Sequence, residues 1–263
     1  MVGRTRKSAD REGRMSFGAH LLELRKRLFT AALAIVIAAV GSFFLADPVL
    51  NALRGPIDAV AETGRTAELN NTVLTEAFDV RLQIAVTLGV VISSPVWLWQ
   101  IWAYIVPALK RTEKRYVVGF FGAALPLFLA GCTMGWFIFP HTVQLLAGFA
   151  PAESTSIFGT KYYVDFATKL IIAIGVGFVL PVFLVLLNFV GVMSAKTILK
   201  GWRVAILVIS LFAALATPAS DVVTMIVLAI PMIALYFVAA GVAWLHDRAL
   251  AKRADKLSAE IAI

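Results

Sequence analysis

Long stretches without a charged residue constrain this chain more than any other feature. There are six of them, at residues 28–46, 82–109, 116–152, 170–195, 204–220 and 222–246. About 20 apolar residues in a helix cross the hydrocarbon core of a bilayer. Five stretches are near or above that length, and the fifth in order, with 17 residues, is shorter. The sequence therefore predicts an all-α membrane protein with five or six spans. It excludes an ordinary soluble domain, which has about 25% charged residues against 15% here.

The positive charges decide between five spans and six. Of the 24 Lys and Arg residues, 19 lie in four segments, at residues 1–27, 110–115, 193–203 and 246–263. The connections between these segments, at residues 46–81 and 141–162, hold three and one. Because Lys and Arg are in excess in cytoplasmic loops, both termini are expected in the cytoplasm and the number of spans must be even. We predict six spans, and we attribute the net charge of +8 to this topology and not to nucleic acid.

The predicted boundaries divide the chain into three parts. Residues 1–14 are expected to form a basic, disordered arm, residues 15–246 the transmembrane domain, and residues 247–263 a cytoplasmic tail. The six predicted spans are residues 28–46, 82–105, 116–140, 163–192, 204–217 and 222–245. The first is too long for the apolar region of a cleavable signal peptide, so we expect it to be retained.

Two of the spans have unusual lengths. Thr75 is placed to cap a helix that continues from Glu76 to Ile105, over 30 residues or about 45 Å. Span 204–217 reaches only about 21 Å, less than a core of about 30 Å, so the bilayer is expected to thin beside it. Spans 5 and 6 are both expected to be short. The bundle should also be curved and kinked, because prolines occur inside spans. These prolines are Pro95, Pro126, Pro181 and Pro231.

Polar groups inside the predicted spans are few. Asp165 and Lys169 are one helical turn apart and are expected to form an ion pair. Gln100 and Asn188 are expected to form hydrogen bonds with neighbouring helices. No cluster of His, Cys, Asp and Glu has metal-ligand spacing, and no phosphate-binding loop occurs. We therefore expect no metal, no cofactor and no enzymatic activity.

Two acidic residues stand alone among cations at the basic ends of the predicted spans. Glu23 lies in HLLELRKRL (residues 20–28), and Glu113 lies in LKRTEKR (residues 109–115). Spacing alone supports a modest interpretation, in which Glu23 pairs with Arg27 at i,i+4 and Glu113 offsets its neighbours.

At these residues the sequence resembles the TatC family, the multispanning subunit of the bacterial twin-arginine protein translocase. The motifs that carry the resemblance are HLLELRKRL at 20–28, Gly55-Pro56, Ser94-Pro95, QIWAYIVPAL at 100–109, Glu113-Lys114-Arg115, Phe139-Pro140, Thr217-Pro218, Asp221 and LAIPM at 228–232. The resemblance implies a receptor in the bacterial inner membrane, which binds signal peptides with two adjacent arginines at its cytoplasmic face. It further implies assembly with single-span Tat subunits and with copies of itself, to export folded cargo at the expense of the proton gradient.

The resemblance also implies roles for particular residues. The residues implied in signal-peptide binding are Glu23, Glu113, Arg25, Arg27 and Tyr104. The two glutamates would contact the arginine pair, since a carboxylate accepts both prongs of a guanidinium, a geometry that lysine cannot copy. The residues implied in functional loops and kinks are Pro56, Pro95, Pro140 and Asp221. Pro56 and Pro95 in particular would shape the first external loop and the bend in span 2.

The chain departs from the family's pattern at Val179, where a glutamate or glutamine is common. Either the role of that polar group falls to another residue such as Gln100, or the step it assists needs no polar group here.

Two other classes of function are open at this point. A small-solute secondary transporter needs coupled acids or unwound half-helices at mid-membrane, and the sequence offers almost none. A membrane enzyme needs a nucleophile with its base, or a metal set, and neither is visible.

Overall fold

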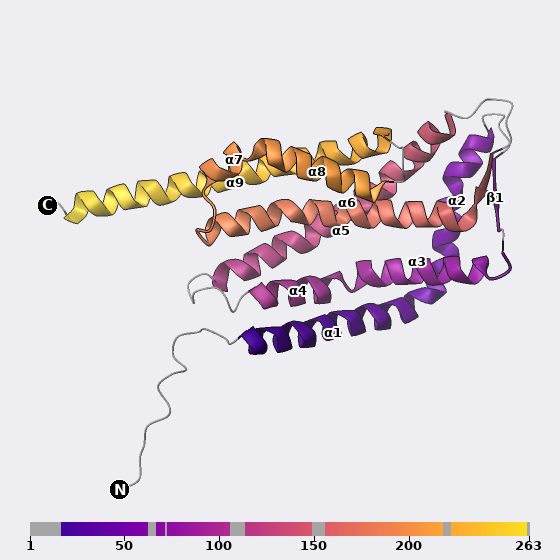
Figure 1. The fold of residues 1–263 in the computed structure, drawn as a ribbon, viewed down its shortest axis with the longest axis horizontal. Helices are drawn as coiled ribbons and strands as arrows, with labels where there is room; N and C mark the ends of the chain where they lie inside the picture. Colours follow the sequence, from indigo (N-terminus) through magenta and orange to yellow (C-terminus); the bar gives the residue numbers. More distant parts are fainter. Residues whose placement is uncertain are drawn as a thin grey trace, which may run out of the picture.

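The computed structural model describes residues 17–62, 67–71, 73–105, 114–148, 156–217 and 222–261, and nearly all of them are helical. The elements in chain order are α1 (Phe17–Ser42), η1 (Phe43–Leu45), α2 (Ala46–Glu62), β1 (Ala67–Asn70), α3 (Glu76–Ile92), α4 (Ser94–Ile105), α5 (Lys114–Gly148), β2 (Ser156–Gly159), α6 (Thr160–Phe189), α7 (Ala195–Lys200), α8 (Trp202–Ala216) and α9 (Val222–Ile261). The long helices run side by side, and α2 turns across one end of the bundle (Figure 1).

The described helices are those of a membrane protein. Four continuous helical segments are long and apolar enough to cross a bilayer, and the first of them runs from α1 through η1 into α2. The bent pair α3–α4 makes a fifth, whereas α8 is apolar but shorter, with 15 residues. The start of α1 and the end of α9 lie at the same end of the bundle, opposite α2 (Figure 1). We call the end with the start of α1 the inner end and the α2 end the outer end.

The predicted single helix over residues 76–105 is wrong. The chain breaks at Ser93 between α3 and α4, whose axes differ in direction by 56°. Pro95 accounts for the break, because it has no amide hydrogen with which to continue the hydrogen bonds of α3 into α4. The cap expected from Thr75 is also absent, since its hydroxyl makes no capping hydrogen bond. The Glu76 carboxylate instead accepts hydrogen bonds from the backbone amides of Val73 and Lys161, at 3.3 and 2.9 Å.

Other boundaries differ from the predicted spans because helices continue past the apolar stretches. The third span ends not at Pro140 but at Gly148, so this proline lies inside α5. The helix that contains predicted span 6 is longer than the span, since α9 has 40 residues and continues through the predicted tail to Ile261. Pro56 lies inside α2 and is buried, where a loop was expected. The expected span 204–217 agrees closely with α8.

A pair of short strands corrects the expectation of an all-helical chain. β1 and β2 pair in parallel at the outer end, with Ala67 opposite Ser156 and Asn70 opposite Gly159. β1 follows α2 in the chain and β2 follows α5. Their pairing therefore holds these two connections together at the outer end of the bundle.

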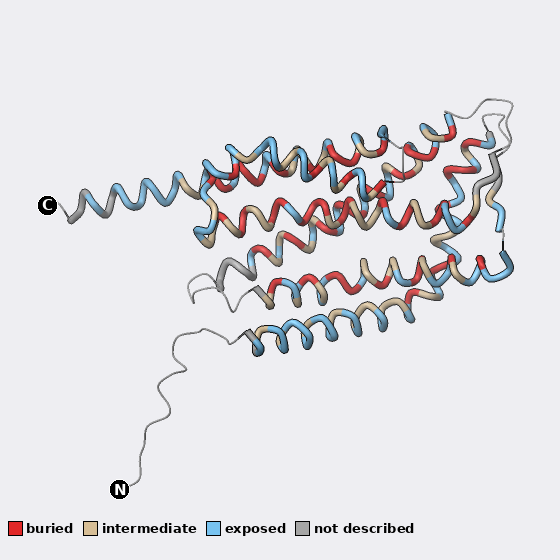
Figure 2. The backbone as a smooth tube through the Cα atoms, in the orientation of Figure 1, coloured by how far each residue is buried: buried red, intermediate tan, exposed pale blue. Residues whose placement is uncertain are grey.

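Glycines bring α5 and α6 into backbone contact. A Cβ atom on Gly131 would lie 2.8 Å from the Cα of Gly175, and one on Gly175 would lie 2.5 Å from the Cys132 sulfur. One turn along α5, a Cβ on Gly135 would lie 2.9 Å from the Cα of Ile171. Small residues at such positions let membrane helices approach closely and gain van der Waals contact. α6 is accordingly buried over most of its length, whereas α1 and the end of α9 are largely exposed (Figure 2).

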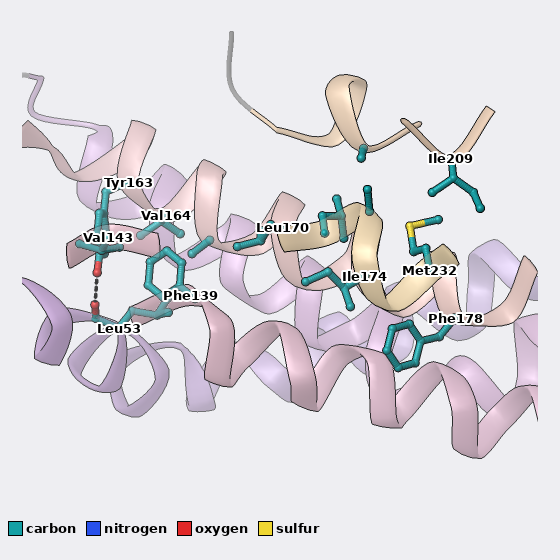
Figure 3. Close-up of a cluster of buried hydrophobic side chains, with 14 of the residues drawn as sticks. Leu53, Phe139, Val143, Tyr163, Val164, Leu170, Ile174, Phe178, Ile209 and Met232 are labelled. Atoms are coloured by element: carbon teal, nitrogen blue, oxygen red, sulfur yellow. Dashed lines mark hydrogen bonds between the residues drawn. The ribbon is translucent and has the colours of Figure 1, made fainter. Parts of the chain in front are cut away.

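The outer half of the core joins α2, α5 and α6 (Figure 3). The Tyr163 hydroxyl on α6 donates a 2.6 Å hydrogen bond to the Leu53 carbonyl on α2. The ring of Phe139 on α5 packs edge-on against Tyr163, with centroids 5.3 Å apart. Leu170 and Ile174 continue this cluster along α6 and are completely buried. These contacts hold α2 across the outer end of the bundle.

The glycine contact predicts a site-specific loss of stability. Gly131→Leu should lower the free energy of unfolding by about 1–3 kcal/mol or more, because the new side chain meets the backbone of α6. Gly122→Leu is the matched control on the same helix, since a Cβ there meets nothing within 4 Å. Thermal unfolding of both variants in detergent, followed by circular dichroism, checks this. Equal melting temperatures would contradict the packing described.

Candidate functional site: an acidic group in an apolar groove at the inner end

A groove of about 420 Å³ opens between α1 and α4 at the inner end of the bundle. Its walls are mostly apolar, with Leu24 and Leu28 from α1 and Ile101 from α4. Arg27, Gln100 and Tyr104 supply its polar groups. The break at Ser93 sets the direction of α4, and so it fixes how α4 faces α1 across the groove.

Glu23 and Arg27 form the ion pair that their spacing predicts. The Arg27 guanidinium donates two hydrogen bonds to one carboxylate oxygen, Oε1, with the Nε to Oε1 distance at 3.0 Å. Its third nitrogen lies 3.4 Å from the side-chain oxygen of Gln100 on α4. The expected hydrogen bond between Gln100 and a neighbouring helix is therefore present, with Arg27 as the donor, and it links α4 to the pair on α1.

The second carboxylate oxygen of Glu23, Oε2, is buried and has no hydrogen-bond partner among the described residues. The side chains of Glu23 and Arg27 are 20% and 25% exposed, so the pair is neither in the core nor fully in water. An oxygen withdrawn from water without a partner carries a desolvation cost, which a donor from a ligand would remove. The site is thus prepared to accept one more charged hydrogen bond.

Aromatic stacking fixes one edge of the groove. Tyr104 on α4 stacks on His20 on α1, with centroids 4.4 Å apart and planes at 22°. Arg25 is exposed, and no hydrogen bond or ion pair is recorded for it within the described part of the chain. The structure therefore brings Glu23, Arg27 and Tyr104 to one place and leaves Arg25 on the surface beside them.

The other predicted site residues lie elsewhere or outside the described residues. Glu113 and Asp221, with the arm at residues 1–14, fall outside them. Pro95 opens α4 directly after the break. Pro56 and Pro140 lie in helices toward the outer end, so neither borders the groove.

Two features at the inner end escaped the sequence analysis. Trp102 lies near the end of the second uncharged stretch, where it is 1% exposed and stacks on Phe183 of α6, with centroids 4.9 Å apart. Asp247 accepts hydrogen bonds from the Asn188 amide and the Ala195 backbone, at 2.9 and 2.7 Å. It thereby joins α9 to α6 and α7. In the sequence, Asp247 is recognisable as a carboxylate that directly follows the uncharged stretch 222–246 and opens a basic segment.

Val179 of α6 is buried in the same apolar cluster as Leu98 and Trp102. The buried indole nitrogen of Trp102 in this cluster has no hydrogen-bond partner among the described residues. Among the described residues, no group of three or more His, Cys, Asp or Glu side chains could hold a metal ion.

Comparison with known proteins agrees with this architecture. Residues 19–231 match the family model TatC, described as Sec-independent protein translocase protein. The chain is 43% identical to the Sec-independent protein translocase protein TatC of Xylanimonas cellulosilytica, over 96% of this chain and 90% of that protein. It is 36% identical to TatC of Rothia mucilaginosa, over 95% of this chain and 85% of that one.

Two solved structures share the fold. A crystal structure of the twin-arginine translocase receptor TatC superposes with a TM-score of 0.73 at 30% identity, over 86% of this chain and 98% of that one. A second, of the same receptor in the detergent DDM, has a TM-score of 0.75 at 30% identity, over 85% and 99%. Members of this family are components of a protein translocase and not enzymes. The apolar spans, the matched model and the two superpositions together establish that the chain belongs to the TatC family.

Proposed function

We propose that this chain is the receptor and core subunit of a twin-arginine translocase, which binds Arg-Arg signal peptides in the groove between α1 and α4. The observation that carries the proposal is the buried, unpartnered oxygen of Glu23, among the described residues, beside an apolar groove. Arg27 holds the carboxylate in place through the other oxygen. A guanidinium from a signal peptide would then bind the free oxygen.

The chemistry of the groove favours arginine over lysine. A guanidinium offers parallel donors to a carboxylate, whereas an ammonium offers a point charge without that geometry. Charge-assisted hydrogen bonds of this kind are worth about 1.5–3 kcal/mol. Long-range attraction does not help, because 19 of the 24 cationic side chains lie in segments assigned to this face. Recognition therefore depends on short-range contact between the carboxylate and the guanidinium. The apolar walls of the groove bind the apolar part of the signal peptide.

The remaining predicted residues have supporting roles in this proposal. Glu113, in the connection between α4 and α5, would supply the carboxylate for the second arginine. Tyr104 closes one side of the groove through its stack on His20. Arg25 and Arg27 orient the α1 segment, and Pro95 sets the bend that presents α4.

The proposed topology has six crossings with both termini in the cytoplasm of a bacterial cell, across its inner membrane. The crossings are α1, the bent pair α3–α4, α5, α6, α8 and α9. The predicted parts of the chain keep their roles, with residues 1–14 as a basic cytoplasmic arm, 15–246 as the membrane domain and 247–263 as the cytoplasmic tail, into which α9 continues as far as Ile261. The positive charges, and the start of α1 and the end of α9 at the same end of the bundle in Figure 1, support this orientation.

Assembly with single-span Tat subunits and with further copies of the chain completes the proposal. The exposed faces of α1, α8 and α9 are rich in large apolar residues, and they are available both to lipid and to partner helices. Val179 removes the polar group that the family commonly has in α6, so docking that relies on it would use another group here. Gln100, which lines the proposed signal groove, is one such group. The proton gradient would drive the assembled complex.

Photo-crosslinking at the groove tests the receptor function. A photoreactive amino acid at position 101, which is exposed at the groove, should crosslink an Arg-Arg signal peptide in membranes. Glu23→Gln should lower the yield about tenfold or more, since it removes the charge but keeps the shape. A Lys-Lys peptide should crosslink as weakly with the unaltered chain.

Asp255→Asn is the control for this experiment, because Asp255 is an exposed carboxylate at the same end on α9. It should leave the yield unchanged, and Glu113→Gln should act like Glu23→Gln. If the Arg-Arg and Lys-Lys peptides crosslink equally and neither glutamate matters, both carboxylates are surface ion pairs and the receptor proposal fails.

Cysteine labelling tests the proposed topology. The one native cysteine, Cys132, is 6% exposed, so an impermeant maleimide should react chiefly with introduced thiols. In spheroplasts, Asn71→Cys after β1 should react at once. Leu250→Cys on α9 should react only after the membrane is permeabilised. Labelling of Leu250→Cys in intact spheroplasts would contradict a cytoplasmic C-terminus.

A further inference from the structure

A second groove, of about 970 Å³, lies between α3 and α6 in the outer half of the bundle. The end of α8 borders it through Leu215 and Ala216. It shares Val176 with the proposed signal groove, but none of the polar groups proposed for that site lies in it. Its lining is divided, with charged and amide groups toward the outer end and apolar side chains toward the middle of the bundle.

The outer part of this groove holds equal numbers of positive and negative groups. Lys161 pairs with Asp79 across the two helices at 2.9 Å, and Lys169 pairs with Asp165 within α6. The Gln83 amide on α3 donates to Asp165 at 3.2 Å, which fixes that carboxylate. The four charged side chains are 39–65% exposed, so an incoming group can reach them.

The deeper part of the groove is apolar. Val86 on α3, Ile172 and Val176 on α6, and Phe212 on α8 line it. The groove thus has a polar mouth with two cations and two carboxylates, followed by an apolar channel. This is the order of chemistry along a phospholipid molecule, from headgroup to acyl chain.

Helix lengths bring lipid headgroups to the level of this mouth. Lys169 lies nine residues into α6, or about 13 Å along the helix. α6 has 30 residues and spans about 45 Å, against a core of about 30 Å, so Lys169 lies below the usual headgroup level. α8, however, spans only about 22 Å with its 15 residues, and its outer end borders the same groove. Mismatch of this kind is relieved by local thinning, which lowers the headgroups to the ion pairs.

We propose that this groove binds one phospholipid with a zwitterionic, amine-bearing headgroup, of the phosphatidylethanolamine type. Its phosphate would contact Lys161 and Lys169, its ammonium would donate to Asp79 and Asp165, and one acyl chain would lie along Ile172 and Val176. An anionic headgroup would find no excess positive charge here. A quaternary ammonium would find carboxylates but has no N–H with which to donate. The inference does not rest on signal-peptide recognition.

Lipid retention by the purified full-length chain tests this proposal. The protein is reconstituted in vesicles that contain equal parts of phosphatidylethanolamine, phosphatidylcholine and phosphatidylglycerol, and is extracted in mild detergent. Native mass spectrometry then counts the bound lipids. We expect retention of phosphatidylethanolamine at least tenfold above the other two. A photoreactive phosphatidylethanolamine should label peptides of α3 and α6.

A matched pair of variants places the site. Asp165→Asn combined with Lys169→Gln should lower phosphatidylethanolamine retention about tenfold, because it removes one ion pair of the mouth. Asp47→Asn combined with Arg81→Gln is the control, since that 2.9 Å ion pair has similar exposure and does not line the groove. The reactivity of the buried Cys132 thiol toward a thiol reagent, measured as the protein is heated, shows whether each variant is folded.

Equal retention of the three lipids by the unaltered chain would overturn the proposal without any variant. So would unchanged retention in the Asp165/Lys169 variant. A fall in both variant pairs would mean that net surface charge and not the groove governs retention, and would also overturn it. Crosslinks from the lipid probe confined to α1 or α9 would place the lipid elsewhere.

Discussion

The backbone contact between α5 and α6 is the interaction on which the rest of the bundle depends. Without side chains at Gly131 and Gly175, the two helices approach until backbone meets backbone. α6 is thereby centred in the molecule, and α2, α3, α8 and α9 pack around it. At the inner end, Trp102 of α4 stacks on Phe183 of the same central helix. The position of α4, and with it the groove that faces α1, therefore follows from how α6 is held.

The charged groups of the two candidate sites, one at each end of the molecule, differ in whether their hydrogen-bonding atoms have partners. At the inner end, the Glu23 carboxylate is surrounded by cations, is fixed by one of them, and keeps an oxygen without a partner among the described residues. At the outer end, the four described charges that line the second groove form two pairs, Asp79 with Lys161 and Asp165 with Lys169. A site with an unsatisfied acceptor is suited to a cationic peptide, whereas balanced pairs are suited to a zwitterion. The first case follows from the rule that a partly buried polar group gains most from the partner it lacks, and the second from the complementary charges of the groove and a zwitterionic headgroup.

Short-range rules predicted much of this structure. Uncharged stretches located the described long helices except α2, which lies where a loop was expected, and the i,i+4 rule predicted both Glu23–Arg27 and Asp165–Lys169. The break at Ser93 was missed because Pro95 was interpreted as a kink and not as the start of a new helix.

Long-range features could not be predicted from periodicity. β1 and β2 are separated by the whole of α3, α4 and α5, and no local pattern reports their pairing. The burial of Trp102 could not be predicted for a related reason, since amino-acid composition does not distinguish an aromatic ring that faces lipid from one in the core. For the groove, the sequence predicted Glu23, Arg27 and Tyr104 through the family motif. The stack on His20, and a Glu23 oxygen that has no partner in the described part of the chain, required coordinates. Glu113 and Asp221 lie outside the described residues, so their roles stay predictions.

The central claim is that a carboxylate of α1 recognises a guanidinium and not merely a positive charge. A double-mutant cycle measures this most directly, with dissociation constants for Arg-Arg and Arg→Lys signal peptides, each bound to the unaltered chain and to Glu23→Gln in lipid nanodiscs. The account predicts a coupling free energy of about 1.4 kcal/mol or more, a tenfold effect, for at least one of the two arginines. Effects of peptide and protein changes that simply add, for both arginines, would contradict it.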